Sequence, residues 1–505
     1  MAELQVAQTA LFTALAWLVP VGLALLAIGA AHEAQAELVA ATTLIALAAA
    51  LGGYLVCGFA FQFGGVAHVS DLAGLHGLTA EWSPLDTSWG PGWGLVGLRG
   101  FLLQGAAYHT DAYLLFASQL PAVVTTVLVT LLALCTHVRR VLLLPMGLLV
   151  SGLLYPLLGN WVWGGGWLAR LGQNVELGHG FVDAGGSATV FLLGTLASLA
   201  TFLILKPKRT PEPGPAALPP IHFPLFVVLG ALLSIAGWPG LVLSNPLSRG
   251  SVPAPLALVN LAMAAAGGSL LVSLYTWFVT SQPNALAIAR GAVAGLVAAS
   301  AACPFVPAGA ALLIGSVAGL LMVLTLYLWE QVLRLQDPSA SVAVFGVPAV
   351  WGTLALAIFA DGRWGAGWNG VGVKEYLDTV GQGISGLLLA SGYQSAGPGQ
   401  FQAQVTGLAA VLAVGLLLPW LLVKASLWIK SAGQARTAAP VPPEPADAPE
   451  DGQVDDLTTS DGESPPCEEP SPAADTFPLQ PLDPPDEHAG SKTPSRRRKR
   501  TYPSA

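Results

Sequence analysis

The segment "DAGGSATVF" (residues 183–191) opens a long apolar stretch, and its pattern returns as "DPSASVAVF" at residues 337–345. Both segments read D-x-x-x-S-x-x-V-F, and each opens a stretch long enough to cross a membrane. Helix positions four and eight residues apart drift slowly around the axis, so the aspartate, serine and phenylalanine of each segment share one face. The match therefore predicts an internal repeat in which Phe191 and Phe345 meet near the middle of the protein.

The composition is typical of a membrane protein. Of the 505 residues, 53% are hydrophobic and only 10% are charged, whereas a soluble domain carries about 25% charged residues. A spanning helix needs about 20 mostly apolar residues, and eleven stretches satisfy this requirement. The expected spans are residues 10–31, 36–64, 112–135, 140–159, 185–205, 222–243, 254–279, 284–302, 306–330, 340–360 and 404–430. We therefore expect an all-α polytopic membrane protein.

The two copies of the motif open the fifth and the tenth expected span. Because five is an odd number, two units of five spans lie in the membrane with opposite orientation. The sequence thus predicts a 5+5 inverted repeat, with halves at about residues 10–205 and 222–360, followed by a long C-terminal helix at about 404–430. Transporters built from inverted repeats place their path at the interface between the repeats.

Basic residues in short loops predict the orientation of the chain. They fall on one side of the membrane if the N-terminus is outside and the C-terminus is cytoplasmic. These residues are "HVRR" (137–140), "KPKR" (206–209), Arg334, Lys424 and Lys430. The longer loops 65–110, 160–183 and 361–403, rich in Gly and Trp, then face outward. We expect a multi-pass protein of the plasma membrane.

The C-terminal part of the chain differs in character from the rest. Residues 435–505 are rich in Pro, Ser and acidic residues and end in "SRRRKR" (495–500), which predicts a disordered cytoplasmic tail after a transmembrane domain of residues 1–430. From Ser431 to Ala505 there are 14 acidic and 7 basic residues, which leaves 15 acidic and 14 basic residues in the body. The nearly neutral body gives no electrostatic support for binding nucleic acid. The tail is a candidate arm for an unidentified cytoplasmic partner.

The motif aspartates are candidates for helix caps. An aspartate before a helix accepts hydrogen bonds from the free N–H groups of the first turn. Asp337 is followed by Pro338, which is favoured at the first helical position, so we expect Asp337 to be a cap. For Asp183 a second role is open, because the same carboxylate lends negative potential to a neighbouring cation site.

Several segments resemble the ammonium transporter (Amt/Mep/Rh) family. They are "NWVWGGGWLARLG" (160–172), "GFVDAGGS" (180–187), "GAVAGLVAASAACPFVPAGAALLIGSVAGL" (291–320), "VFGVPAVWGTLA" (344–355) and, more weakly, "CGFAFQFGG" (57–65). The resemblance covers about residues 35–430. It implies an eleven-helix fold with an inverted repeat, a homotrimer with a pore in each subunit, and conduction of ammonium or ammonia through the lipid bilayer.

The resemblance also assigns candidate site residues. Trp163 matches the tryptophan of the family's outer ammonium site, where an indole face attracts the cation, and Asp183 matches the essential aspartate near it. Ala122 and Leu241 stand where the family has two stacked gate phenylalanines, and Asn245 falls near the serine of the outer site.

The expected pore departs from the family at its centre. The family has a pair of histidines at mid-membrane, and here the matching positions are Phe191 and Phe345, with Ser187 and Ser341 on the same helix faces as further pore-lining candidates. None of the eight histidines lies in the middle of an expected span. Two imidazoles offer hydrogen bonds and a proton relay, whereas two benzyl groups offer neither.

Three functions remain open at this point. The first is an ammonium or ammonia transporter or channel with an altered pore. The second is a non-conducting sensor or scaffold of the same fold, and the third is a channel for another small neutral solute. The sequence has no metal cluster, phosphate loop or nucleophile–base pair, so we expect no enzyme activity, no cofactor and no metal.

Overall fold

The computed structural model describes residues 2–70, 72–89, 92–205, 223–248, 251–335 and 339–425. The chain divides into two units, Met1–Ala439 and Pro440–Ala505, and all of the described residues belong to the first. The expected cap Asp337, the "KPKR" loop and the tail after residue 435 lie outside the described residues.

The described residues contain eleven helices that are long and apolar enough to cross a membrane, as the sequence predicted. The first five spans are α1 (Ala2–Ala16) with α2 (Leu18–Ala30); α3 (Glu33–Gly53) with η1 (Tyr54–Gly58), α4 (Phe59–Phe63) and η2 (Val66–His68); α6 (Thr110–Leu134); η6 (Arg140–Leu142) with α7 (Leu143–Leu149), η7 (Val150–Leu154) and α8 (Tyr155–Trp163); and η8 (Ser187–Leu192) with α10 (Leu193–Leu205).

The next five spans and the last one continue in the same manner. They are α11 (Pro224–Leu243); α12 (Ala254–Thr280); α13 (Ala285–Ala302); α14 (Ala308–Tyr327) with η10 (Leu328–Val332); η11 (Val342–Gly346) with α15 (Val347–Phe359); and α16 (Gly399–Leu412) with η13 (Ala413–Leu417).

The two halves repeat one pattern of helix pairings, which confirms the 5+5 arrangement. In the first half α3 packs on α6 and α7, and α6 packs on α10; in the second half α12 packs on α13 and α14, and α13 packs on α15. The halves meet where α2 packs on α11 and where η8 packs on α15 and η11. The later part of each copy of the sequence motif lies in a π-helical segment, η8 or η11, and four more such segments occur among the described residues. Such wide turns are rare and often mark functional sites.

The fourth span is longer than the sequence suggested. We expected it to end at residue 159, but α8 continues to Trp163. The helix stops there because Gly164 donates its N–H back to the carbonyls of Gly159 and Asn160, and Gly165 then takes a left-handed φ of +89°. Trp163 is therefore the last residue of a helix and not part of a loop.

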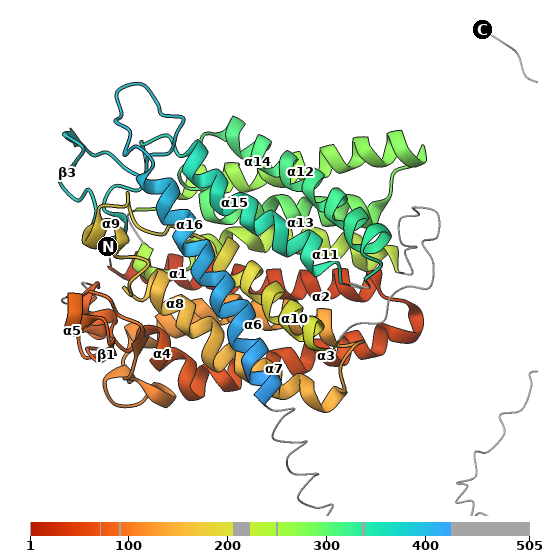
Figure 1. Cartoon of the computed structure of the whole chain (residues 1–505), viewed down its shortest axis with the longest axis horizontal. Helices are drawn as coiled ribbons and strands as arrows, with labels where there is room; N and C mark the ends of the chain where they lie inside the picture. The colour runs from red at the N-terminus through yellow and green to blue at the C-terminus, as the bar shows by residue number, and fades with distance from the viewer. Residues whose placement is uncertain are drawn as a thin grey trace, which may run out of the picture. The chain divides into compact units, whose positions relative to one another are not determined.

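Short elements gather at one end of the helices, which we call the loop end. Figure 1 shows α5, β1, α9 and β3 at this end and α16 running diagonally across the other helices. α16 contacts α15, α10 and η8. The short elements are η3 (Ala73–Leu75), β1 (Glu81–Trp82), α5 (Asp86–Trp89), β2 (Val96–Gly97), η4 (Phe101–Leu103), η5 (Gly105–Ala107), α9 (Leu171–Val175), η9 (Pro246–Ser248), η12 (Trp368–Gly370), β3 (Glu375–Tyr376) and β4 (Thr379–Val380). β1 pairs with β2 and β3 with β4, both antiparallel.

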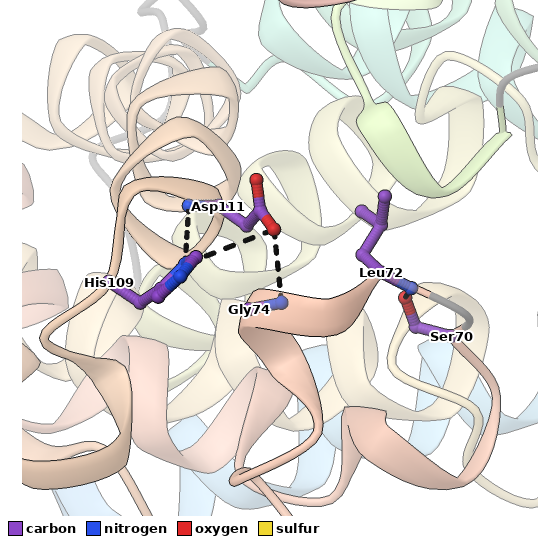
Figure 2. A network of polar contacts seen from close by, with 5 residues as sticks. All are labelled: Ser70, Leu72, Gly74, His109 and Asp111. Carbon is purple, nitrogen blue, oxygen red and sulfur yellow. Dashed lines mark hydrogen bonds and ion pairs between the residues drawn. The ribbon is translucent and has the colours of Figure 1, made fainter. Parts of the chain in front are cut away.

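A small polar network fixes the first loop to the start of α6 (Figure 2). The Asp111 carboxylate accepts a hydrogen bond from the Gly74 N–H (3.1 Å), and His109 Nδ1 accepts one from the Asp111 N–H (3.2 Å). A Cβ at Gly74 would collide with the His109 ring. The side chain of Ser70 accepts from the Leu72 N–H (3.2 Å). The loop therefore lies directly on the helix terminus.

Glycines allow the second-half helices to approach closely. A Cβ at Gly315 of α14 or at Gly295 of α13 would collide with the same carbonyl oxygen, that of Ala264 on α12. Small residues at such contacts let membrane helices pack backbone to backbone.

We expect Gly315→Ala to lower the stability of the purified protein by about 1–3 kcal/mol, the usual effect of overpacking a tight core. The matched control is Gly309→Ala on the same helix, where an added Cβ meets nothing within 4 Å. This control should change stability by less than about 1 kcal/mol. Thermal unfolding in detergent measures both, and equal midpoints for the two variants would contradict the packing argument.

Candidate functional site

Asp183 lies four residues before the first helical residue of the fifth span and is fully buried. Its Oδ2 accepts hydrogen bonds from the N–H groups of Ala188 (3.0 Å) and Thr189 (2.9 Å) and from the Thr189 hydroxyl (2.9 Å). These donors belong to the first turn of η8, whose N–H groups have no partner within the helix. Asp183 thus caps the helix, as its position in the sequence suggested.

The second carboxylate oxygen of Asp183 has a different environment. Oδ1 is buried and has no hydrogen-bond partner among the described residues. Burial raises the pKa of Asp183, and the hydrogen bonds from Thr189 and Ala188 oppose this rise. A buried acceptor without a donor costs about 1–3 kcal/mol. The cap therefore uses one carboxylate oxygen of Asp183 and leaves the other, Oδ1, without a donor among the described residues.

Trp163 is attached directly to this aspartate. Its indole Nε1 donates a hydrogen bond to the backbone carbonyl of Asp183 (3.0 Å). The ring of Tyr155 lies beside it, with 6.3 Å between the ring centroids. The end of α8 and the start of η8 are thereby held together, and the sequence-predicted pair Trp163 and Asp183 forms one structural unit.

A cavity of about 390 Å³ opens at the loop end beside Trp163. Of the five expected outer-site residues, Trp163 and Asn245 line it. Its other polar and aromatic lining residues are His68, Ser70, Arg170, Gln173, Ser248, Ser251, Trp368 and Asn369. Sequence reasoning missed the cavity because its walls come from four separate segments of the chain.

The remaining outer-site candidates do not line this cavity. Asp183 is fully buried, and Ala122 on α6 and Leu241 on α11 are each 8% exposed. Both apolar side chains belong to the main hydrophobic core. Their assignment to the outer site stays a prediction from the resemblance.

Three aromatic rings stack at the centre of the protein. Phe191 and Phe345 lie parallel, with 5.9 Å between ring centroids and 10° between planes. Trp238 of α11 also stacks on Phe191, at 5.0 Å and 9°. Phe191 and Trp238 are fully buried, and Phe345 is 7% exposed. The prediction that the two motif phenylalanines meet is confirmed.

Trp238 was not singled out from the sequence. Its Nε1 donates to the Ser300 hydroxyl on α13 (2.7 Å), and this hydroxyl donates in turn to the Leu296 carbonyl (2.8 Å). The indole is therefore fixed in the plane that the stack requires. Trp238 and Ser300 lie in two different spans, the sixth and the eighth. No local sequence pattern relates them, so the sequence alone did not indicate this contact.

The motif serines lie at helix contacts. Ser187 donates to the Val297 carbonyl (2.7 Å) and accepts from the Ala301 N–H (2.8 Å), both on α13. Ser341 is fully buried, and its backbone carbonyl accepts from the Thr195 hydroxyl (3.3 Å). The Ser187 hydroxyl joins span five to span eight, and the assignment of both serines to a pore stays a prediction.

A second group of polar residues, also missed from the sequence, lies among the first four spans. Tyr54 donates to Gln62 Oε1 (2.8 Å), Gln62 donates to Gln119 Oε1 (3.2 Å), and Tyr155 donates to the same Gln119 oxygen (2.9 Å). Because Tyr155 lies against Trp163, this buried network continues inward from the Trp163–Asp183 unit. It gives the half-buried indole a rigid support.

His179, in the loop before Asp183, is a further buried polar group. It is fully buried, and neither ring nitrogen has a hydrogen-bond partner among the described residues. Its ring meets Tyr376 edge to face, with 4.9 Å between centroids. Burial lowers the pKa of His179 from 6.5 to about 4.

This lowered pKa predicts acid sensitivity of the loop end. The unfolded chain binds a proton on this histidine below pH 6.5, while the folded protein resists it down to about pH 4. Stability should therefore be full above pH 6.5 and fall as the pH drops toward 4, by up to about 3 kcal/mol. We expect His179→Phe to reduce this pH dependence in thermal unfolding, whereas the exposed His76→Phe leaves it in place; identical profiles for both variants would argue against it.

In the part of the chain that the structure describes, ten membrane-length helices in two matching halves, followed by an eleventh and built around a buried polar and aromatic centre, define the class of this protein as an all-α polytopic membrane protein with an inverted repeat. Among the described residues, no group of three His, Cys, Asp or Glu side chains is placed to hold a metal ion. The model of the Ammonium Transporter Family matches residues 7–436. The chain belongs to this family.

Individual relatives agree with this membership. Ammonium transporter Amt2 of Archaeoglobus fulgidus is 32% identical over 277 residues, which cover 54% of this chain and 59% of the relative. The ammonium transporter of Bacillus subtilis is 28% identical over 301 residues, covering 59% and 71%. The chain thus spans less than two thirds of the length of the Archaeoglobus relative.

Solved structures show the same fold. A structure described as "Sensor Amt Protein" superimposes with a TM-score of 0.64 at 22% identity, covering 85% of this chain and 95% of the other. Mep2 of Candida albicans also gives a TM-score of 0.64, at 21% identity, and covers 83% of each chain.

Proposed function

We propose that this protein recruits ammonium at the Trp163–Asp183 unit and lets ammonia cross the membrane without carrying net charge. The observation that carries the proposal is Asp183 Oδ1, a buried carboxylate oxygen without a donor among the described residues, next to an indole held by the same residue. The names of the relatives, which are ammonium transporters, support the choice of solute.

The proposed recruiting site combines two attractions for a small cation. A tryptophan face attracts a cation by about 0.5–2 kcal/mol. A buried carboxylate adds Coulomb attraction that water screens weakly. Asp183 is fully buried and does not line the cavity, so its carboxylate acts on the cation through its electric field and not by direct contact. Desolvation of the cation near the apolar core then favours its neutral form.

The central stack favours passage of the neutral form. Phe191, Phe345 and Trp238 carry no ionisable group, and the one polar atom of the stack, Trp238 Nε1, is used by Ser300. An ion in such surroundings pays a solvation penalty of several kcal/mol that a neutral molecule avoids. Ammonia crosses when the rings, which have only two side-chain torsions each, move apart.

A second candidate function rests on the closure of the same stack. The parallel rings fill the centre so fully that Phe191 and Trp238 have no exposed surface. A pore that stays closed would make the protein an ammonium-binding sensor or scaffold, with the acidic tail as its contact to a cytoplasmic partner. This candidate predicts binding at the loop end without any flux.

The setting of the protein follows from the same proposal. The loop end faces outward and the C-terminus inward, in the plasma membrane, because Arg139 and Arg140 lie in the loop at the opposite end of α6. Assembly into a homotrimer would cover part of the apolar surface of each subunit. Transport leaves the solute chemically unchanged, so it requires no catalytic group.

Flux measurements in liposomes test the proposal. The purified protein is reconstituted with a pH-sensitive dye inside, and external ammonium chloride is raised suddenly. We expect the interior to become alkaline faster than in empty liposomes, because entering ammonia takes up protons. Equal rates with and without protein would overturn the transport proposal and leave the sensor.

A further inference from the structure

The loop-end cavity is far larger than the proposed solute needs. Its volume is about 390 Å³, whereas a molecule of the size of water or ammonium occupies about 30 Å³. The cavity also contains Arg170, whose permanent positive charge attracts an anion. Size and charge both indicate a second ligand at this place.

The guanidinium group of Arg170 is fixed in place and can pair with an anionic ligand. Its Nε donates to the Gly165 carbonyl (3.0 Å), which fixes the guanidinium against the glycine run. Among the described residues it has no carboxylate partner within 4 Å. Glu81 interacts with it electrostatically, from more than 4 Å away.

The cavity walls are polar and also carry aromatic surface. Trp163 and Trp368 supply two indole surfaces, and the amides of Gln173 and Asn245 supply hydrogen-bond donors and acceptors. A small organic molecule with a polar group can use both kinds of contact. No carboxylate is among the described lining residues.

The number of permanently charged side chains in the cavity indicates the charge of the ligand. Arg170 is the one permanently charged side chain among the described lining residues, and the Nε2 of His68 is hydrogen-bonded to the Thr79 carbonyl (3.1 Å). One guanidinium neutralises one negative charge, and its planar donors fit a carboxylate in two-point contact. A doubly charged phosphate would need a second fixed cation.

We propose that the loop-end cavity binds a small organic monocarboxylate, with its carboxylate on Arg170 and its carbon skeleton against Trp163. This site goes beyond the proposed transport of ammonia and does not depend on it. Its ligand would lie over Asn245 and Trp163 and so cover the proposed recruiting site from the loop end.

Calorimetric titration of the purified full-length protein with sodium benzoate tests the site. Benzamide serves as the neutral ligand of the same shape, and sodium phosphate as the inorganic anion. We expect saturable binding of benzoate, with benzamide and phosphate weaker by about tenfold or more, since a charge-assisted bond contributes about 1.5–3 kcal/mol.

Variants locate the binding. Arg170→Gln should lower the affinity for benzoate by about tenfold and leave the affinity for benzamide unchanged. The benzoate affinity of Arg170→Lys should lie between those of Arg170→Gln and the parent protein. The matched control is Arg363→Gln, an exposed arginine at the same end that pairs with Asp361 and does not line the cavity. The proposal is overturned if benzoate does not bind, if benzamide or phosphate binds equally well, or if Arg170→Gln binds benzoate as the parent does. If Arg170→Gln fails to fold, titration of the parent protein and of Arg170→Lys with the three ligands still tests the proposal.

Discussion

In liposomes carrying Asp183→Ala, we expect the protein-dependent ammonia flux to disappear. The substitution removes the buried charge beside Trp163 and the acceptor of three hydrogen bonds from Ala188 and Thr189. It also leaves buried donors of the first turn of η8 without a partner, which should lower stability by about 2–4 kcal/mol. The dye assay measures the flux, and thermal unfolding measures the stability.

Asp183→Asn separates the two roles of this residue. The amide oxygen can still accept from the first turn of η8, so most of the cap remains, but the negative charge is gone. We expect a folded protein with no flux above empty liposomes. Asp361→Asn is the matched control, because this loop-end aspartate accepts a hydrogen bond from the Arg363 N–H and does not line the cavity beside Trp163. Full flux in Asp183→Asn would show that the carboxylate acts only as a cap.

The second large effect concerns the central stack. In Phe191→His with Phe345→His, we expect an ammonium-dependent electrical current that the parent protein lacks. The two rings are neighbours, with 5.9 Å between centroids, so two imidazoles at these positions can hydrogen-bond and pass a proton once their ring edges rotate toward each other. Recording on a solid-supported membrane detects the current after an ammonium jump.

The single variants are the controls for this result. Phe191→His or Phe345→His alone provides one imidazole and no relay, and each should remain electrically silent. Burial of imidazoles in place of benzyl groups should lower stability by about 1–3 kcal/mol, so unfolding is measured for all three. A folded double variant without current would show that the centre is closed for reasons other than its missing imidazoles.

The sequence predicted the fold well because membrane spans are local. Each span is a run of apolar residues, and the D-x-x-x-S-x-x-V-F repeat by itself relates span five to span ten. The helix ends were less accurate: the tryptophan at 163 belongs to α8, because the stop signal is the conformation of Gly164 and Gly165 and not a loss of hydrophobicity.

The site was predicted where the repeated motif or the family resemblance contained both partners, as for Phe191 with Phe345 and Trp163 with Asp183. Asp183 and its cap to Thr189 lie six residues apart and were visible in the sequence. Other contacts join residues from distant spans and loops. Examples are the hydrogen bonds of Trp238 to Ser300 and of Gln62 to Gln119, and the cavity around Arg170. Such pairings depend on how the helices pack, and no local pattern contains that information.

The central claim is that ammonia passes this protein without charge, and one paired measurement tests it most directly. The same proteoliposomes are exposed to an ammonium jump while internal pH and membrane current are recorded together. The aromatic stack and the Trp163–Asp183 unit predict a rapid internal alkalinisation with no current. A current that scales with ammonium in the parent protein, or no change in either signal, would contradict the claim.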